Sequence, residues 1–221
     1  MLKSRLVVAL VLMGSGAMSV SAGLPNRPAE EEGAKSKLHA PLLDGGDQTE
    51  ALIRAKLLND PMSPVVGAKY PTLKIVTFTN YDCMDCKKLE KNLERLLKNH
   101  IDIAITYKLL SYGSDMTTAA TRTALSVWIE QPEKFYAFHH ALMFYRGMPD
   151  DSCIRSAVSD AGVKLKTYRQ DTQHIIDVNK ALFRRLHLTD MPTTIIGDNV
   201  LTGVVPYQIL EKALDEALRN S

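Results

Sequence analysis

The fold of this chain is decided by residues 73–86, LKIVTFTNYDCMDC. Residues 73–79 are rich in β-branched and aromatic side chains, which predicts a buried strand. The polar residues 80–82 then turn the chain, and beyond them the apolar positions recur at helical spacing. The stretch therefore predicts a strand that leads into a helix, with Cys83 and Cys86 at the junction.

The pattern outside this stretch completes an α/β chain. Apolar and polar side chains alternate at residues 101–107, which predicts a second strand and so a βαβ unit around the helix. Strand character returns only at residues 193–196 and 200–202, and an amphipathic helix is predicted at residues 206–219. The segments in between have helical patterns, namely residues 116–129, 132–144, 150–161 and 164–187.

This order, βαβ, then an all-helical block, then ββα, predicts a thioredoxin fold with an all-helical insertion between its two halves. We expect the thioredoxin domain to comprise residues 65–111 and 188–221, and the helical insertion to comprise residues 112–187. Residues 23–64 precede the domain as an N-terminal extension. Its first half is polar and is expected to be a flexible lead-in, and residues 51–58 predict a short helix.

Residues 1–22 have the order of a secretory signal peptide. Lys3 and Arg5 form a short basic start, residues 6–13 are uniformly apolar, and residues 20–22 form a small-residue cleavage site. We therefore expect export to the periplasm, with an uncleaved N-terminal anchor as the alternative. The apolar run is too short to span a bilayer, and no later stretch is long enough either.

The charge balance argues against nucleic acid or anionic lipid as a partner. The chain has 27 basic and 25 acidic residues, and loss of Lys3 and Arg5 with the signal peptide would make the mature chain formally neutral. No basic stripe is visible in what remains. The chain has 3 cysteines, an odd number for an exported protein, so one is left over if the other two pair.

Cys83 and Cys86 fit redox chemistry better than the other uses of this spacing. A zinc ribbon needs a second pair of ligands, a covalent haem needs His where Lys87 stands, and a disulfide across so short a loop stabilises little. Cys83 opens a helix, where unpaired N–H groups and the helix dipole stabilise the attacking thiolate. Cys86 falls one turn inside on the apolar face, where it can resolve a mixed disulfide.

Three segments resemble the ScsC-like branch of the DsbA family: residues 57–67, residues 78–83 and residues 191–193. The resemblance implies a thioredoxin fold with a helical insertion, a nucleophilic Cys83, a resolving Cys86 and a cis bond before Pro192. It places Met84, Asp85 and Met191 against the substrate. Similar proteins often oligomerise through N-terminal helices, so the extension could do the same, or it could pack as an arm on the domain.

Two departures from this family bear on the direction of exchange. Similar proteins usually carry, six residues before the nucleophile, a Glu that handles the proton of the buried Cys, but this chain has Thr77 there. Proton handling would then fall to water or to another carboxylate. Asp82 and Asp85 should repel a thiolate on Cys83 and raise its pKa. Lys87 and Lys88 would oppose this, but both are expected to point into solvent.

The predicted function is thiol–disulfide exchange with unfolded or misoxidised exported proteins through Cys83 and Cys86. A less stable thiolate makes a weaker oxidant, so the pair should lean towards isomerase or reductase activity. A membrane redox partner of DsbB or DsbD type would reset it, and no metal or organic cofactor is required. The alternative is a non-catalytic copper-handling protein that binds Cu(I) through the same two cysteines.

Other residues that could carry chemistry have simpler interpretations. Cys153 is either a buried helical thiol or the site of an intermolecular disulfide. His139 and His140 are adjacent on a helix and point about 100° apart, so they are expected to have separate core and surface roles. Lys108 either ends a strand in solvent or corresponds to a basic residue that is common there in similar proteins.

Overall fold

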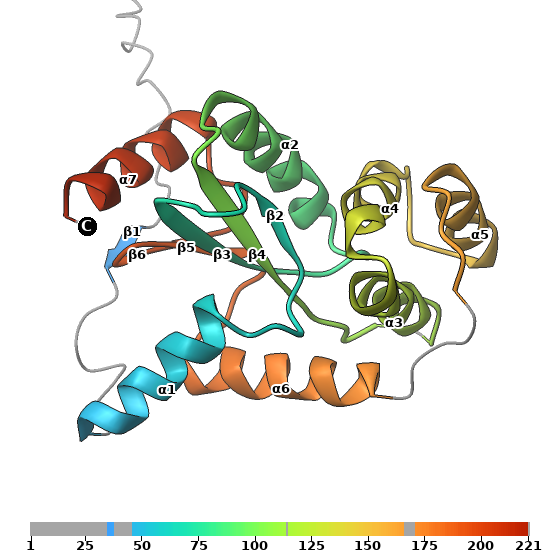
Figure 1. Cartoon of the computed structure of the whole chain (residues 1–221), viewed down its shortest axis with the longest axis horizontal. Helices are drawn as coiled ribbons and strands as arrows, with labels where there is room; N and C mark the ends of the chain where they lie inside the picture. Colours follow the sequence, from blue (N-terminus) through green and yellow to red (C-terminus); the bar gives the residue numbers. More distant parts are fainter. Residues whose placement is uncertain (1–34, 38–45, 114, 166–170, 221) are drawn as a thin grey trace, which may run out of the picture. The chain divides into compact units, whose positions relative to one another are not determined.

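The structure, a computed structural model, describes residues 35–37, 46–113, 115–165 and 171–220 (Figure 1). The expected signal peptide and most of the polar lead-in lie outside the described residues. The strands are β1 (Lys35–Lys37), β2 (Val65–Gly67), β3 (Leu73–Thr79), β4 (Ile103–Leu109), β5 (Thr193–Ile196) and β6 (Asn199–Thr202). The helices are α1 (Gly46–Leu58), α2 (Met84–Asn99), α3 (Asp115–Glu130), α4 (Pro132–Phe144), α5 (Asp151–Asp160), α6 (Thr172–Arg185) and α7 (Tyr207–Arg219).

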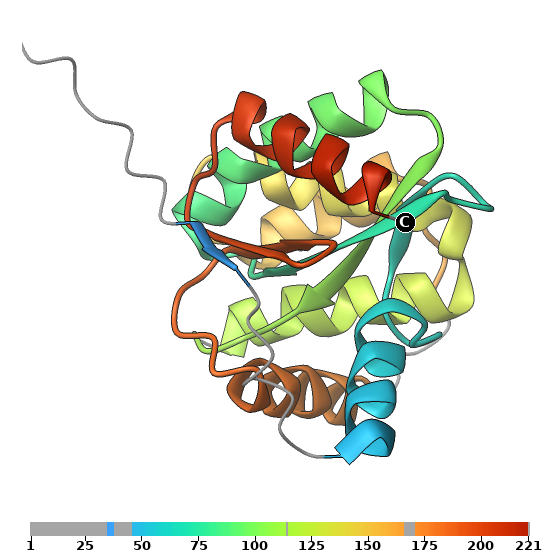
Figure 2. The same cartoon turned by 90° about the vertical axis from the view of Figure 1, so that its left-hand side faces the viewer.

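The strands form one mixed sheet in the order β1-β6-β5-β3-β4-β2. The quoted stretch lies at its centre, because β3 pairs in parallel with β4 and antiparallel with β5. Both faces of the sheet are covered, with α2 and α7 on one face and α1 and α6 on the other (Figures 1 and 2). A strand covered on both faces has no side that faces solvent, which explains why apolar residues of β3 point to both faces.

The two faces bury separate apolar clusters, and alternate residues of β3 enter different ones. Ile75 packs in the larger cluster with Leu89 and Leu93 of α2, whereas Val76 and Phe78 pack in the smaller one with Phe183 of α6. This alternation follows from the two-residue period of a strand. It also means that Thr77, two residues after Ile75, faces α2.

Helices α3 to α6 lie between β4 and β5 in the chain, and this confirms the predicted thioredoxin fold with a helical insertion. Helices α3, α4 and α5 gather beside the sheet, and α6 runs beneath it next to α1 (Figure 1). Phe135 and Phe138 of α4 reach into the larger cluster, so the insertion shares the core of the thioredoxin domain.

Three local predictions were wrong. Part of the lead-in is not irregular, because β1 pairs antiparallel with β6. A short strand was missed at β2, where residues 65–67 pair with β4. Helix α6 begins at Thr172 rather than near residue 164, because the Gln131 side chain hydrogen-bonds both backbone groups of Lys164 and so holds that residue outside any helix.

Lys108 is buried in the fold rather than solvated at the end of a strand. Its side chain is fully buried, and its ammonium group donates hydrogen bonds to the Ser63 hydroxyl at 2.7 Å and to the Lys56 carbonyl. Its third partner is the Asp60 carboxylate, at 3.5 Å. Burial lowers the pKa of Lys108 to about 8, although Asp60 opposes the shift. Lys108 therefore ties β4 to the segment between α1 and β2.

Candidate active site

Cys83 and Cys86 form a disulfide at the N-terminus of α2. The Cys83 amide donates to the Asn80 carbonyl at 3.4 Å, which closes the turn after β3. Cys83 is the N-cap residue of the helix, and its sulfur accepts a hydrogen bond from the Cys86 amide at 3.0 Å. The first turn of α2 thus directs an otherwise unpaired N–H group at the Cys83 sulfur, which favours a thiolate there after reduction.

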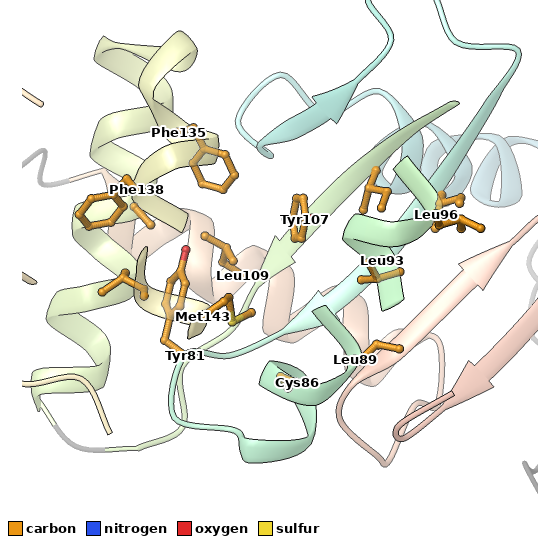
Figure 3. Close-up of a cluster of buried hydrophobic side chains, with 14 of the residues drawn as sticks. Tyr81, Cys86, Leu89, Leu93, Leu96, Tyr107, Leu109, Phe135, Phe138 and Met143 are labelled. Atoms are coloured by element: carbon orange, nitrogen blue, oxygen red, sulfur yellow. The ribbon is translucent and has the colours of Figure 1, made fainter. Parts of the chain in front are cut away.

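The two cysteines differ in their access to solvent. Cys83 is half-buried, whereas Cys86 is 1% exposed. Cys86 begins a row on the inner side of α2 that continues with Leu89, Leu93 and Leu96 (Figure 3). A substrate can therefore reach Cys83 but not Cys86.

The segment before β5 lies against Cys83. The Met191–Pro192 peptide bond is cis, as the resemblance implied. The Cys83 sulfur lies 3.8 Å from the Met191 carbonyl oxygen, and the Pro192 carbonyl accepts a hydrogen bond from the Gly203 amide at 2.8 Å. The Met191 side chain is half-buried and touches both apolar clusters.

The two acidic residues expected to tune Cys83 have different surroundings. Asp82 is half-buried immediately before the pair. Asp85 is exposed, and its carboxylate pairs with the Lys88 ammonium group at 2.8 Å. Met84 is 56% exposed. A solvated ion pair is weak, so Lys88 offsets only part of the charge of Asp85.

Lys87 does not point into solvent, contrary to expectation. It is 6% exposed, and its ammonium group donates to the Tyr145 carbonyl at 2.8 Å and to the Gly147 carbonyl at 2.6 Å. Burial lowers the pKa of Lys87, while Cys153 and Asp82 oppose the shift. The side chain lies inward because the segment just after α4 passes beside α2 and offers two backbone carbonyl groups to the Lys87 ammonium group.

A buried polar cluster beneath α2 was not foreseen. Tyr107 of β4 donates its hydroxyl proton to the Glu90 carboxylate at 2.8 Å, and His139 of α4 lies 3.5 Å from the same oxygen. The other ring nitrogen of His139 lies 2.8 Å from the Tyr81 hydroxyl. The sequence did contain one signal, because Glu90 falls on the apolar face of α2, one turn after Cys86.

The other candidate residues named from the sequence have surroundings that fit a structural role. His139 is buried while His140 is half-exposed and pairs with Glu94, which confirms their separate roles. Cys153 is a free, buried thiol on α5. Within the described part of the chain, no group of three or more His, Cys, Asp or Glu side chains could hold a metal ion. Among the same residues, no helix has the length and apolar character needed to cross a membrane.

Comparison with known proteins identifies similar chains. A family model described as Thioredoxin matches residues 59–216. A periplasmic thioredoxin-like protein from Salmonella enterica serovar Typhimurium is 38% identical, with a TM-score of 0.74, over 76% of this chain and 97% of that one. The catalytic domain of Proteus mirabilis ScsC is 34% identical, with a TM-score of 0.73, over 78% and 98%. Disulfide bond formation protein D of Bacillus subtilis is 19% identical over 172 residues, 71% of this chain and 78% of that protein.

Proposed function

Since the chain belongs to the DsbA family of thioredoxin-like proteins, in its ScsC-like branch, we propose that it is a periplasmic thiol–disulfide oxidoreductase acting on exported proteins. The observation that carries the proposal is the unequal exposure of the Cys83–Cys86 disulfide at a helix N-terminus. The accessible Cys83 sulfur is the one that the N-terminus of α2 activates, and the sheltered Cys86 sulfur is bonded to it. The basic and apolar order of residues 1–22 supports export.

Each residue of the site has a proposed role. In the reductive direction the Cys83 thiolate attacks a substrate disulfide, forms a mixed disulfide and releases one substrate thiolate. Cys86 then attacks the Cys83 sulfur, which releases the second substrate thiolate and restores the Cys83–Cys86 disulfide. Met191, next to Pro192, presents its backbone groups to an extended substrate beside Cys83, and the oxidative direction is the reverse of these steps.

The substrate surface includes a groove beside the cysteine pair. It lies between the first turns of α2 and the end of α4, and its lining includes Met84, Met143, Phe144, Lys91 and Arg146. Methionine and aromatic side chains adapt to varied apolar partners. Such a surface suits unfolded or misoxidised proteins, whose apolar segments are exposed around their cysteines.

The charges near Cys83 favour reductase or isomerase activity over strong oxidation. Asp82 and Asp85 disfavour the thiolate of the reduced form, and a strong oxidant needs that thiolate to be stable. Redox titration against glutathione measures the balance directly. A potential as high as about −120 mV, as for a strong oxidant, would contradict this part of the proposal.

Two partners follow from the chemistry. The pair must be reset after each turnover, which calls for a membrane oxidase of DsbB type or a membrane reductase of DsbD type. Residues 23–64 are a candidate oligomerisation segment. Light scattering on the full chain and on a chain without residues 23–45, a deletion that keeps the partners of Lys108, gives the number of subunits in each, and the same number in both would exclude residues 23–45 from that role.

Reduction of insulin and refolding of scrambled ribonuclease test the activity itself. We expect Cys83→Ser to abolish both activities and Cys153→Ser to leave both intact, because Cys153 is a buried free thiol that is not part of the Cys83–Cys86 disulfide. Cu(I) competition against a chelator should run in parallel. Tight copper binding without either activity would replace the enzyme proposal with the copper-handling alternative.

A further inference from the structure

The inner side of α2 carries a carboxyl group one turn beyond Cys86. Glu90 and Cys86 are each 1% exposed, and they are separated by four positions on the same helix. Residues at this spacing share a face, with their Cβ atoms about 5–6 Å apart. Cys86 and Glu90 thus lie one turn apart on the same buried face of α2.

The Glu90 carboxylate accepts a hydrogen bond from β4 and lies next to a histidine of α4. Tyr107 donates to it from β4 at 2.8 Å, and the Nε2 atom of His139 lies 3.5 Å away on α4. The Nδ1 atom of His139 lies 2.8 Å from the Tyr81 hydroxyl. Within the described residues the Nε2 atom forms no hydrogen bond, so His139 lies against the carboxylate without bonding to it.

The strand below Cys86 offers no such group. Thr77 pairs with Tyr107 across β3 and β4, so both side chains face α2. The Thr77 hydroxyl lies 3.4 Å from the Thr194 hydroxyl, and a hydroxyl of this kind does not exchange protons as a base near neutral pH. Any proton acceptor in this layer must therefore come from the helix side.

The other ionisable groups around Cys86 either pair with other residues, keep their protons or, like Asp82, are partly open to solvent. On α2, Asp85 is exposed and pairs with Lys88, and Lys87 donates to the end of α4. Glu94 lies one turn further from Cys86 and contacts Tyr136 and His140 of α4. Before the helix stands the half-buried Asp82. Burial, with a smaller contribution from Glu90, raises the pKa of both Tyr81 and Tyr107, so both keep their protons.

We propose that Glu90 is the proton acceptor and donor for Cys86 during thiol–disulfide exchange. The inference rests on the proposed function and assigns the proton transfer of the same site. In the reductive direction the Glu90 carboxylate takes the Cys86 proton, and the new thiolate attacks the Cys83 sulfur. The Cys83–substrate bond breaks, the Cys83–Cys86 bond forms, and the substrate leaves as a thiolate that takes a proton from water. Glu90 then returns its proton to solvent.

The resolving step can be observed with oxidised glutathione. The reduced protein first forms a Cys83–glutathione adduct, and Cys86 then resolves it and releases glutathione. Rapid acid quenching and mass spectrometry measure the adduct over time. We expect Glu90→Gln to form the adduct at the wild-type rate but to resolve it about tenfold or more slowly, as for loss of a general base. Glu94→Gln is the matched control, because Glu94 is also buried on α2 beneath a Tyr hydroxyl, and it should resolve like wild type.

The pH profile separates proton transfer from a structural effect. Without an internal acceptor, resolution should rise about tenfold per pH unit below the thiol pKa, as the thiolate fraction does. We expect this slope for Glu90→Gln and a much shallower one for wild type. If the variant does not fold, the slope of the wild-type profile alone still tests the inference.

The inference would be overturned if the resolution rate of the wild-type protein rose about tenfold per pH unit. It would also be overturned if Glu90→Gln resolved the adduct at the wild-type rate, or if Glu94→Gln slowed resolution as much as Glu90→Gln. A wild-type protein that forms no glutathione adduct and reduces no insulin would instead overturn the proposed function, so the two failures are distinguishable.

Discussion

The sulfur of Cys83 lies 3.8 Å from the carbonyl oxygen of Met191, 108 residues further along the chain. This approach brings together the N-terminus of α2 and the start of β5, which belong to the two halves of the thioredoxin domain on either side of the insertion. A substrate bound at Cys83 would lie close to Met191, and we propose that the Met191 side chain contributes to specificity.

Met191→Ala should weaken substrate binding without impairing the chemistry. The change removes the flexible thioether that we place against the substrate but keeps the backbone carbonyl near Cys83. We expect KM for insulin to rise about threefold to tenfold with little change in kcat, since an apolar contact of this size contributes about 1 kcal/mol. Met191→Leu keeps the apolar volume and should retain most of the affinity. A fall in kcat at constant KM would contradict this role.

Asp85→Asn should make the cysteine pair more oxidising. Removal of the negative charge stabilises the Cys83 thiolate and hence the reduced form, so the potential should rise by about 10–20 mV, the size expected for an exposed charge. Lys88→Ala removes the cation that pairs with Asp85 and should lower the potential. Both shifts should shrink at high salt. If the redox potentials of Asp85→Asn and Lys88→Ala shifted in the same direction, or did not shift, Asp85 would not tune the cysteine pair.

Lys87→Met should destabilise the fold, whereas Lys88→Met should not. Lys87 donates from a buried site to the Tyr145 and Gly147 carbonyl groups, and its loss should lower the free energy of unfolding by about 1–3 kcal/mol. Lys88 is exposed, and among the described residues its ammonium group pairs with Asp85. Urea denaturation of both variants measures the difference. Equal stabilities would mean that the loop after α4 does not depend on Lys87.

Lys108 should make stability rise with pH in the mildly alkaline range. Its pKa is about 8 in the folded chain against an ordinary value of 10.5, so between these values the unfolded chain binds the extra proton. Stability is then lower below pH 8 and rises by up to about 1.4 kcal/mol per pH unit above it. Lys108→Met cannot titrate at this position. The wild-type free energy of unfolding minus that of the variant should therefore increase from pH 7.5 to pH 9.5 by about 2 kcal/mol, and a constant difference would refute the prediction.

Much of the fold and the reacting atoms could be predicted from the sequence because they depend on local patterns. The run of β-branched residues at 73–79 marks β3, and the helical spacing after Cys83 marks α2. Cys83 and Cys86 are three positions apart, so their pairing at the start of a helix needs no distant contact. The fold class follows from the order of such elements, which each segment specifies by its own periodicity.

Only the tertiary structure decided which charged side chains are buried and what they contact. The residues beside Lys87 and Lys108 in the chain do not reveal their partners, because carbonyl and hydroxyl groups from distant segments surround both. Glu90 became a candidate proton acceptor only when β4 and α4 brought Tyr107 and His139 to it. Hydrophobic periodicity assigns a side chain to a face, but the partners on that face come from packing between elements that are distant in the chain. The sequence by itself determined the cysteine pair, and the packing beneath it decided which carboxylate can serve that pair.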